Sequence, residues 1–566
     1  MSVLATPPVT EAAVSNGPVA VETLAPEKAS AEPSTMPGTL RGLLLPSFSD
    51  WFFVALMVWL FMAGPYGWSG LLGDGDTGWH IRTGQYILST RTVPHTDLFS
   101  FSLSGHPWYA WEWLSDTIFA LLYGAAGLKG IVLFAGVMIA AFGTMLLRYM
   151  VWRGANGLIA AMVALVAVGA ASIHFLARPH LFTLVFLVGT LWLLDADERR
   201  PSRALWLLAP LTLLWTNLHG GFVIVFVVLG LYGFGALLEG HIRWPGAARY
   251  AALSVACAAA TLVNPYGLEL HRHLLDYLRS DWIRSVVQEF QAPTFRSENQ
   301  MQFEILLLAG ILAAGASLRR KSMKHALLVL GFAHLALTSA RHIPLFAVVA
   351  SPVIAIELTQ LWSGLVDRSQ PRSVIRILGS VAAGASENFR RWSLLIPASV
   401  LVVALVPGIT VWPSDFPRQM FPVGMIAAEQ QRFIGSRVLT TDQWADYLLF
   451  HFWPGTKVFV DGRTDFYGPR IGGQYIDMWH GQGQWRALLD QYGFETALIP
   501  ADWPLCGLLR QDWQWRELRH DKQAVLFARV PRTTQTGSAT GGVRTESSNG
   551  SGRPGPGVLR NHNGRP

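Results

Sequence analysis

Residues 73–113, GDGDTGWHIRTGQYILSTRTVPHTDLFSFSLSGHPWYAWEW, form the longest polar interruption in the first half of a strongly apolar chain. Asp74 and Asp76 stand near its start, and Glu112 stands near its end among aromatic residues. A segment this polar cannot lie in hydrocarbon, because its backbone and side chains would lose water without replacement. We therefore expect it at a membrane surface, with carboxylates at both ends close to the bilayer, and we take it as the candidate active site.

The composition is that of a protein that crosses a membrane several times. Of 566 residues, 51% are hydrophobic and 14% are charged, whereas soluble domains carry about 25% charged residues. The formal net charge of +7 does not indicate a nucleic-acid partner, because lysine and arginine gather in short loops between apolar runs. The two cysteines, Cys257 and Cys506, provide neither a disulfide framework nor a metal-binding motif.

Apolar runs long enough, or nearly long enough, to cross a hydrocarbon core of roughly 30 Å follow one another along the chain. They lie at 50–72, 128–150, 157–176, 179–195, 203–219, 221–239, 247–264, 302–318, 323–341, 342–361 and 392–412. The pattern predicts an α-helical polytopic membrane protein with about eleven transmembrane helices. The segment 113–127 is ambiguous: as a helix it spans only about 22 Å, so it could cross the bilayer or lie along its surface.

Charge bias indicates which side each loop occupies. If 113–150 contributes one net crossing, the basic residues near 148–153, 199–203, 243–249, 319–324 and 368–391 share one face, which the positive-inside rule makes the cytoplasm. The segment 73–113 and everything after residue 412 then lie outside. We expect a disordered cytoplasmic tail at 1–48, a transmembrane domain at 49–412, an extracytoplasmic α/β domain at 413–531 and a disordered tail at 532–566.

The turns expected on the outer face are short and chemically unusual. The motifs ARPHLF, NLHGGF, LVNPYG and SARHIPLF place polar side chains at the ends of helices, namely Arg178, His180, His219, Asn264, Arg341 and His342. One interpretation is that snorkelling side chains anchor these helix ends. The other is that they converge on a cavity open to the outer side. The long loop 264–301 is amphipathic, and we expect it to lie along the interface.

The C-terminal part, 413–531, alternates β-rich runs with helical stretches, which is typical of a small α/β domain. Its VFVDGRTDFYG motif has a predicted strand that ends in Asp461-Gly462-Arg463. An Asp-Gly pair at a strand end is often only a turn. The alternative is that Asp461 and Arg463 belong to a polar cluster that closes over the membrane cavity.

A helix that starts near Asp76 would carry Asp76, Trp79, His80 and Thr83 on one face. The two aspartates could simply cap that helix, where the dipole favours negative charge. In the functional interpretation, one of them is a general base. Transfer from a phosphate-linked donor also needs cations at the leaving phosphate, and Arg178, His219 and Arg341 are expected on the same face.

The order of these features resembles the GT-C superfamily of polytopic glycosyltransferases, such as the protein O-mannosyltransferases and the aminoarabinose transferases. The first polar segment, together with RPHLFT, NLHGGF, NPYG and VDGRTDFYG, looks like a group of uncharacterised bacterial membrane proteins related to that superfamily. The resemblance covers about residues 40–530, and it implies a location in the bacterial inner membrane, at the cell envelope. It also implies a polyprenyl-phosphate sugar donor, with Asp76 or Asp74 as the catalytic acid and Glu112 as a second carboxylate.

The leading hypothesis is therefore a glycosyltransferase that moves a sugar from a polyprenyl phosphate to an unknown glycan, lipid or protein acceptor. The predicted substrate-binding residues are His80, Arg178, His180, His219, Asn264, Arg341, His342, Asp461 and Arg463. The sequence shows no metal ligand set, although members of the superfamily leave a role for Mg²⁺ or Mn²⁺ open. The alternatives are a lipid or polysaccharide transporter or flippase, which would be expected to show repeats, and a non-catalytic cell-envelope scaffold.

Overall fold

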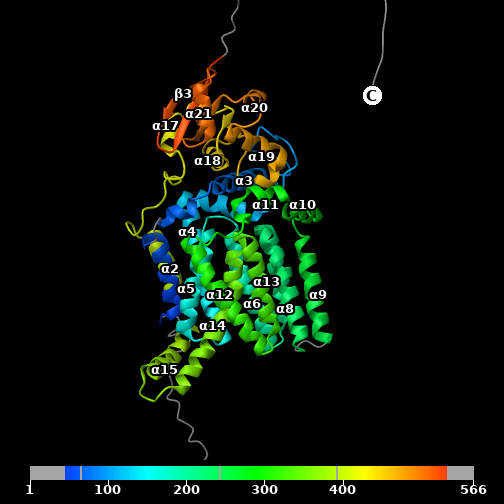
Figure 1. Ribbon diagram of the computed structural model, residues 1–566, viewed down its shortest axis with the longest axis vertical. Coiled ribbons are helices and arrows are strands. Elements are labelled where there is room, and N and C mark those ends of the chain that lie inside the picture. Colours follow the sequence, from blue (N-terminus) through cyan, green and yellow to red (C-terminus); the bar gives the residue numbers. More distant parts are fainter. Residues whose placement is uncertain (1–44, 64–66, 241–243, 391–392, 532–566) are drawn as a thin grey trace, which may run out of the picture.

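The computed structural model describes residues 45–63, 67–240, 244–390 and 393–531. The two tails predicted as disordered fall almost entirely outside the described residues. The described chain consists of a helical bundle, a layer of short helices across one end of it, and a small unit with a β-sheet above that layer (Figure 1). The predicted class, a helical membrane-type fold with a small C-terminal sheet, is confirmed at this level.

Six helices of the bundle are long and apolar enough to cross a membrane. They are Trp113–Arg153, Gly157–His174, His180–Arg199, Gly220–Leu238, Glu298–Arg319 and Ala340–Arg368. Shorter apolar helices occupy Phe48–Met62, Met323–Thr338, Val374–Ala385 and Leu395–Leu405. The prediction of a bundle of apolar helices is therefore confirmed, with six long enough to cross a membrane among the described residues. The predicted count of about eleven crossings is not confirmed.

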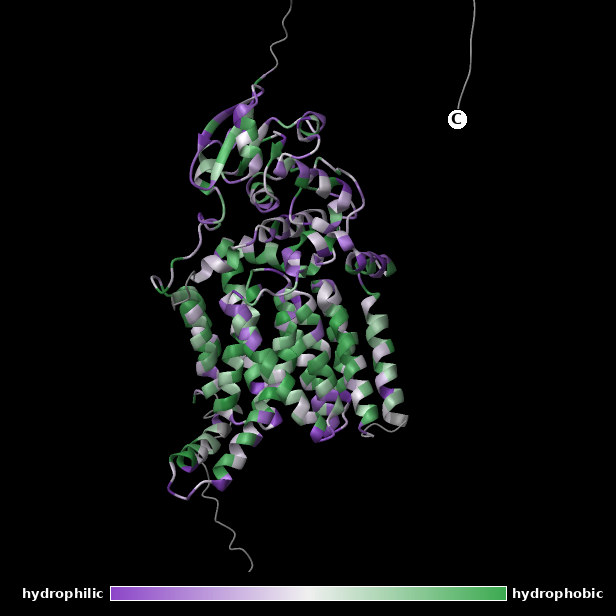
Figure 2. Cartoon of the chain, in the orientation of Figure 1, coloured by the Kyte–Doolittle hydropathy of each residue, from purple (hydrophilic) through white to green (hydrophobic). Residues whose placement is uncertain are grey.

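The helices of the bundle follow the order of the chain. They are α2 (Phe48–Val58), α4 (Trp113–Arg153), α5 (Gly157–Ala171), α6 (His180–Arg199), α7 (Leu208–Leu218), α8 (Ile224–Leu238), α9 (Trp244–Thr261), α12 (Glu298–Arg319), α13 (Met323–Thr338), α14 (Ile343–Arg368), α15 (Val374–Ser386) and α16 (Leu395–Leu405). Hydrophobic residues dominate this part of the chain, and hydrophilic residues gather toward both ends (Figure 2). That distribution is the one expected of helices that span a bilayer.

Three helices lie across the end of the bundle that faces the C-terminal unit, namely α3 (Asp76–Thr90), α10 (Leu268–Arg279) and α11 (Asp281–Val286) (Figure 1). Helix α3 begins at Asp76, as predicted, and packs closely on the first part of α4. A Cβ atom at Gly84 would lie 1.9 Å from the carbonyl oxygen of Asp116. Gly127, with φ of 61°, divides α4 into two helices, so the ambiguous segment 113–127 ends at a break in the helix.

The C-terminal unit contains a four-stranded sheet with the order β1-β2-β4-β3. Its strands are β1 (Val438–Leu439), β2 (Thr496–Pro500), β3 (Trp515–His520) and β4 (Ala524–Arg529). The pair β1–β2 is parallel, whereas β4 pairs antiparallel with both β2 and β3. The helices of this unit are α17 (Val423–Ala428), α18 (Asp442–Phe452), α19 (Thr464–His480), α20 (Trp485–Gln491) and α21 (Pro504–Gln511). Buried apolar side chains on the strands alternate between the two faces, which gives the sheet an apolar core on each side.

The C-terminal unit is fastened to the first polar segment. The Phe101 N–H donates to the Val458 carbonyl and the Val458 N–H to the Phe99 carbonyl, each at 2.9 Å. Helix α18 lies against α3 at two glycines, since a Cβ at Gly75 or Gly78 would come within 2.8 Å of the α18 backbone. The segment 73–113 is thus held between the bundle and the C-terminal unit.

Candidate active site

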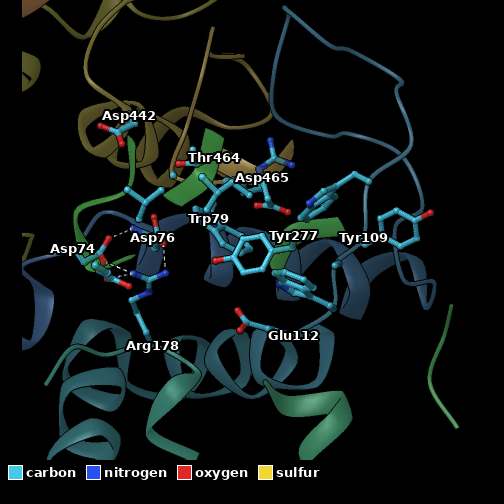
Figure 3. Close-up of a pocket in the computed structure, with 18 of the residues that line it drawn as sticks. Asp74, Asp76, Trp79, Tyr109, Glu112, Arg178, Tyr277, Asp442, Thr464 and Asp465 are labelled. Atoms are coloured by element: carbon cyan, nitrogen blue, oxygen red, sulfur yellow. Dashed lines mark hydrogen bonds and ion pairs between the residues drawn. The ribbon is translucent and has the colours of Figure 1, made fainter. Parts of the chain in front are cut away.

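A cavity of about 190 Å³ lies where the bundle, the first polar segment and the C-terminal unit meet. We call it the main cavity. Its charged and polar lining residues are Asp74, Asp76, Glu112, Arg178, Glu289, Arg341, Asp442, Gln443, Arg463, Thr464 and Asp465. Its aromatic lining residues are Trp79, Trp108, Tyr109, Trp111 and Tyr277. Figure 3 shows Arg178 pointing toward the two aspartates and Glu112 below Tyr277.

Arg178 binds both aspartates that open the first polar segment. Its Nη1 is 2.6 Å from Asp74 Oδ2, and its Nη2 is 2.6 Å from Asp76 Oδ2 (Figure 3). The Asp74 carboxylate also accepts a hydrogen bond from the backbone N–H of Asp76, the first residue of α3, at 3.0 Å. Asp74 therefore binds Arg178 and also satisfies an N–H group at the start of this helix. Burial, opposed by Arg178, raises the pKa of Asp76 to about 8. Asp76 therefore combines an ion pair with a strongly perturbed carboxyl group.

Asp446, which sequence analysis did not identify, lies beside Asp76. The Gly462 N–H donates to both carboxyl oxygens of Asp446 at 3.2–3.3 Å. A Cβ atom at Gly462 would lie 1.9 Å from Asp76 Oδ1 and 2.9 Å from Asp446 Oδ2. Burial, and after it the neighbouring Asp76, raises the pKa of Asp446 well above its usual range. Two buried carboxyl groups this close oppose each other's ionisation, so the charged form of each is disfavoured.

Glu112 lies on the other side of the main cavity, between two histidines. Its Oε2 is 3.7 Å from His80 Nε2, and its Oε1 is 3.5 Å from His219 Nε2. Burial raises the pKa of Glu112 to about 7, and the more distant Arg178 and Arg341 oppose that rise. A carboxyl group that titrates near neutrality can serve as a general base.

Arg341 and Glu289 complete the charged wall. Arg341 Nη1 donates to the Tyr277 hydroxyl at 2.7 Å, and its Nε is 3.9 Å from Glu289 Oε2. Burial alone would raise the pKa of Glu289, but Arg178 and Arg341 lower it to about 2. Glu289 is therefore a permanent anion, and Arg341 is bound less tightly by carboxylates than Arg178 is.

A smaller hollow of about 30 Å³ adjoins this wall on the bundle side. We call it the inner hollow. Its polar lining residues are Glu112, His174, Arg178, His180, His219, Glu289 and Arg341. Two guanidinium groups and three imidazoles around so small a space can donate several hydrogen bonds to one anionic group.

The structure brings together most of the residues that the sequence singled out, and separates others. Asp74, Asp76, Glu112, Arg178, Arg341 and Arg463 line the main cavity, and His180 and His219 line the inner hollow. His80 has no exposed surface and approaches Glu112 from the protein interior, so it cannot contact a substrate directly.

Three predicted substrate-binding residues serve the local backbone or the core instead. The Asn264 amide donates to the Thr261 carbonyl at 2.8 Å, which closes a turn. His342 Nδ1 lies 3.0 Å from the Leu335 carbonyl oxygen. Asp461 is buried beneath Arg463, and it does not line either space. For His342 and Asp461 the anchoring and turn interpretations fit the structure better than substrate binding, whereas Asn264 both closes its turn and lines an apolar groove beside Trp113.

The residues that sequence analysis missed have weak sequence patterns. Asp116 follows Glu112 by one helical turn, which is the only local hint that the two act together. Glu289, Asp442 and Asp446 come from loops and helices without a recognisable motif, whereas Asp465 belongs to VDGRTDFYG. The tertiary fold brings Glu289, Asp442 and Asp465 to the cavity and Asp446 beside Asp76.

The main cavity does not fit a divalent metal ion. Both aspartates at its edge bind Arg178, which occupies the position that a cation would take between them. Among the described residues, no group of three or more histidine, cysteine, aspartate or glutamate side chains is arranged to hold an ion. We therefore assign no step to a metal.

Comparison with known proteins places the fold. No protein-family model matches the sequence, and no curated protein matches it at a significant level. Among solved structures, the archaeal oligosaccharyltransferase AglB from Archaeoglobus fulgidus, in complex with an inhibitory peptide and a dolichol-phosphate, has a TM-score of 0.51 and 11% identity. The alignment covers 80% of this chain and 69% of AglB. The apo form of the A. fulgidus enzyme gives a TM-score of 0.54 at 10% identity, with the same coverage.

A second match is ArnT from Cupriavidus metallidurans bound to undecaprenyl phosphate, with a TM-score of 0.40 and 12% identity over 86% of this chain and 97% of that one. AglB and ArnT are both GT-C glycosyltransferases. At such low identity the AglB match shows the fold alone: this chain has a GT-C fold, as the sequence resemblance implied.

Proposed function

We propose that this protein is an integral membrane glycosyltransferase that moves a sugar from a polyprenyl-phosphate donor to an acceptor at the extracytoplasmic face. The observation that carries the proposal is the main cavity itself. In a fold shared with an oligosaccharyltransferase that was solved with dolichol-phosphate, the cavity combines a near-neutral carboxyl group with three arginines. The outer location remains a prediction from the charge bias of the loops.

The geometry favours Glu112, rather than Asp76, as the general base. Asp76 is bound to Arg178 and crowded by Asp446, whereas no ion pair with lysine or arginine within 4.0 Å holds Glu112 among the described residues. In the proposed reaction, the acceptor hydroxyl loses its proton to the Glu112 carboxylate. The acceptor oxygen forms a bond to the anomeric carbon, and the bond to the phosphate oxygen breaks with its electron pair on the phosphate.

Cations at the inner hollow would stabilise the leaving phosphate. Arg341 is suited to this role because it lines the hollow and its ion pair with Glu289 is long, at 3.9 Å. His219 also lines the hollow, with its Nε2 3.5 Å from Glu112. Arg178 adds positive charge while the two aspartates fix its position. Preorganised donors aimed at developing negative charge are commonly the largest contribution to such catalysis.

The surroundings offer places for the sugar and the lipid. Flat aromatic faces of Trp108, Tyr109 and Trp111 line the main cavity, and rings of this kind pack well on sugars. The lining of an apolar groove of about 380 Å³ includes Trp113, the residue after Glu112, together with Leu114, Leu213, Leu214, Asn217, Val263, Asn264 and Pro265. We propose that the first isoprene units of the donor lie in this groove.

The proposal is tested by incubating the purified protein with radiolabelled polyprenyl-phosphate hexoses and candidate acceptors, with and without Mn²⁺. Glu112→Gln is expected to lower the transfer rate by about 10²- to 10⁴-fold, the range for loss of a general base. Asp276→Asn makes the same chemical change at an exposed position of α10 and should leave the rate unchanged. Full activity of Glu112→Gln would contradict the role of this residue, and lipid translocation without sugar transfer would favour a flippase.

A further inference from the structure

His80 joins Glu112 to a second carboxyl group that has no contact with the cavity. His80 Nδ1 is 2.6 Å from Asp116 Oδ1, and His80 Nε2 faces Glu112. Neither His80 nor Asp116 has exposed surface. The close approach of Gly84 on α3 to the Asp116 backbone fixes the distance between the two helices that carry them. The arrangement is a carboxyl–imidazole–carboxyl series that runs from the protein interior to the cavity.

The proton positions in this series depend on one another. Burial, and after it Arg178, holds the pKa of His80 well below its usual range, so the imidazole is neutral. A neutral imidazole has one N–H donor and one acceptor nitrogen. With the proton on Nδ1, Asp116 is the carboxylate, and Nε2 can only accept from a protonated Glu112. With the proton on Nε2, Asp116 carries a proton, and Nε2 donates to the Glu112 carboxylate.

His219 touches the other oxygen of Glu112 but cannot switch in this way. The Gly221 N–H donates to His219 Nδ1 at 2.9 Å, so neutral His219 carries its proton on Nε2, the atom that faces Glu112. The Thr183 hydroxyl is also within hydrogen-bond distance of His219 Nδ1, at 2.7 Å. His219 is therefore a fixed donor, whereas the partner of His80 is a group that can itself accept or release a proton.

We propose that His80 is a proton relay that moves the proton of Glu112 inward to Asp116 and so generates the carboxylate form of the base. The Glu112 O–H bond breaks as its proton binds Nε2, and the Nδ1 proton passes to Asp116 Oδ1. The imidazole is neutral before and after, and the negative charge moves from Asp116 to Glu112. This inference rests on the function proposed above, in which Glu112 then takes the acceptor proton.

The contact between His80 and Glu112 has to shorten from 3.7 Å to become a hydrogen bond, as catalytic contacts in unliganded enzymes often do. The other charged or titratable groups that act on the pair are Arg178, Arg341, Asp465, His180 and His219. Among the described residues, no arginine and no histidine other than His80 lies within 4.0 Å of the Asp116 carboxyl group, which contacts His80 at 2.6 Å.

Infrared difference spectroscopy of the purified protein tests the relay without any substrate. The carbonyl band that disappears in Glu112→Gln reports the protonated Glu112 and should titrate near pH 7 in the unmodified protein. In His80→Phe the Glu112 carboxylate loses a donor, so its midpoint should rise by about one to two pH units. In Asp116→Asn the amide can donate to Nδ1 and hold His80 as a donor, so the midpoint should fall by about one unit.

Shifts of the Glu112 midpoint in opposite directions in these two variants distinguish a relay from a structural role. A structural role would shift the two midpoints in the same direction or leave both unchanged. Ser115→Ala is the matched control, because Ser115 is equally buried beside Asp116 but donates to the Leu218 carbonyl. It should leave the midpoint unchanged. Unchanged midpoints in both variants, or an upward shift in Asp116→Asn, would overturn the relay. If the shifts appear but the unmodified protein transfers no sugar, the relay stands and the proposed reaction is wrong.

Discussion

Two buried charged groups that face the same cavity, Arg463 and Glu112, are surrounded very differently. Arg463 Nη2 lies 2.6 Å from Asp461 and 2.8 Å from Asp97, and its guanidinium carbon is 4.5 Å from the centre of the Trp108 ring. Among the described residues, the cationic or imidazole groups within 4.0 Å of the Glu112 carboxyl group are two imidazoles, at 3.5 Å and 3.7 Å. The difference shows which group holds the fold and which is available for chemistry.

Arg463 connects two parts of the chain. Asp97 belongs to the first polar segment, while Asp461 and Arg463 belong to the C-terminal unit, and Tyr467 donates to Asp461 at 2.7 Å. These contacts hold Nε and Nη2 of the guanidinium on carboxylates, while Nη1 has no hydrogen-bond partner among the described residues. The polar cluster that the VDGRTDFYG motif suggested therefore exists, but its pairing indicates that it fastens the C-terminal unit over the cavity.

The largest effect on stability is expected from breaking this cluster. Arg463→Met leaves Asp97 and Asp461 as buried, unpaired anions, so it should destabilise the protein by about 3–5 kcal/mol. Thermal and denaturant unfolding in detergent measure the loss. Arg486→Met is the control, because Arg486 forms an ion pair with Asp512 but is largely exposed, and a surface pair contributes little. Equal stability of the two variants would mean that Arg463 does not fasten the unit.

A smaller effect is expected at the glycine where the two aspartates meet. In Gly462→Ala the added methyl group would overlap Asp76 Oδ1, so the C-terminal unit must shift away from α3. Overpacking of this kind costs about 1–3 kcal/mol. Gly473→Ala is the control, since no atom would lie within 4 Å of its new Cβ. The chain between α16 and α17 links the bundle to the C-terminal unit, and its proteolysis should accelerate in Gly462→Ala alone. Equal rates in the two variants would contradict the close approach of Gly462 to Asp76.

The contrast between Arg463 and Glu112 also explains how far the sequence could predict the structure. Hydropathy predicted the helical bundle, and the aspartates predicted the start of α3 near Asp76. Hydropathy does not report where a helix breaks, however. The expected crossing at 203–219 is a short 3₁₀ turn, Arg203–Leu207, followed by α7, and α4 is interrupted at Gly127.

The site was predictable only where its residues lie in conspicuous polar turns. Arg178, His219 and Arg341 were found because a polar residue at a helix end in an apolar chain is unusual. Asp446 and Asp116 were not found, because each lies in an ordinary helix and gains its meaning from a neighbour on another element. Whether a charged residue is paired or free is decided by tertiary contacts, which local patterns do not contain.

The smallest effect is a pH dependence of the contact between the bundle and the C-terminal unit. The pKa of Asp76 in the folded protein is about 8 and that of Asp446 is also raised, whereas both titrate near 4 when unfolded. A raised carboxyl pKa contributes stability that is complete below the unfolded pKa and is lost as the pH rises through the folded one. Between pH 7 and pH 8 the free energy of unfolding should fall by about 1 kcal/mol, since the pair of Asp76 and Asp446 releases one proton.

Asp446→Asn distinguishes the effect of the Asp446 carboxyl group on Asp76 from the effects of the other charges around the pair. These are Arg178, Asp74, Asp442 and Asp461. An amide beside Asp76 can donate a hydrogen bond at any pH, so Asp76 can ionise without a second anion next to it. The unfolding midpoint of the variant should therefore change less between pH 7 and pH 8 than that of the unmodified protein. Parallel pH profiles would assign the dependence to other groups and would make Asp76 an ion-pair partner of Arg178 alone.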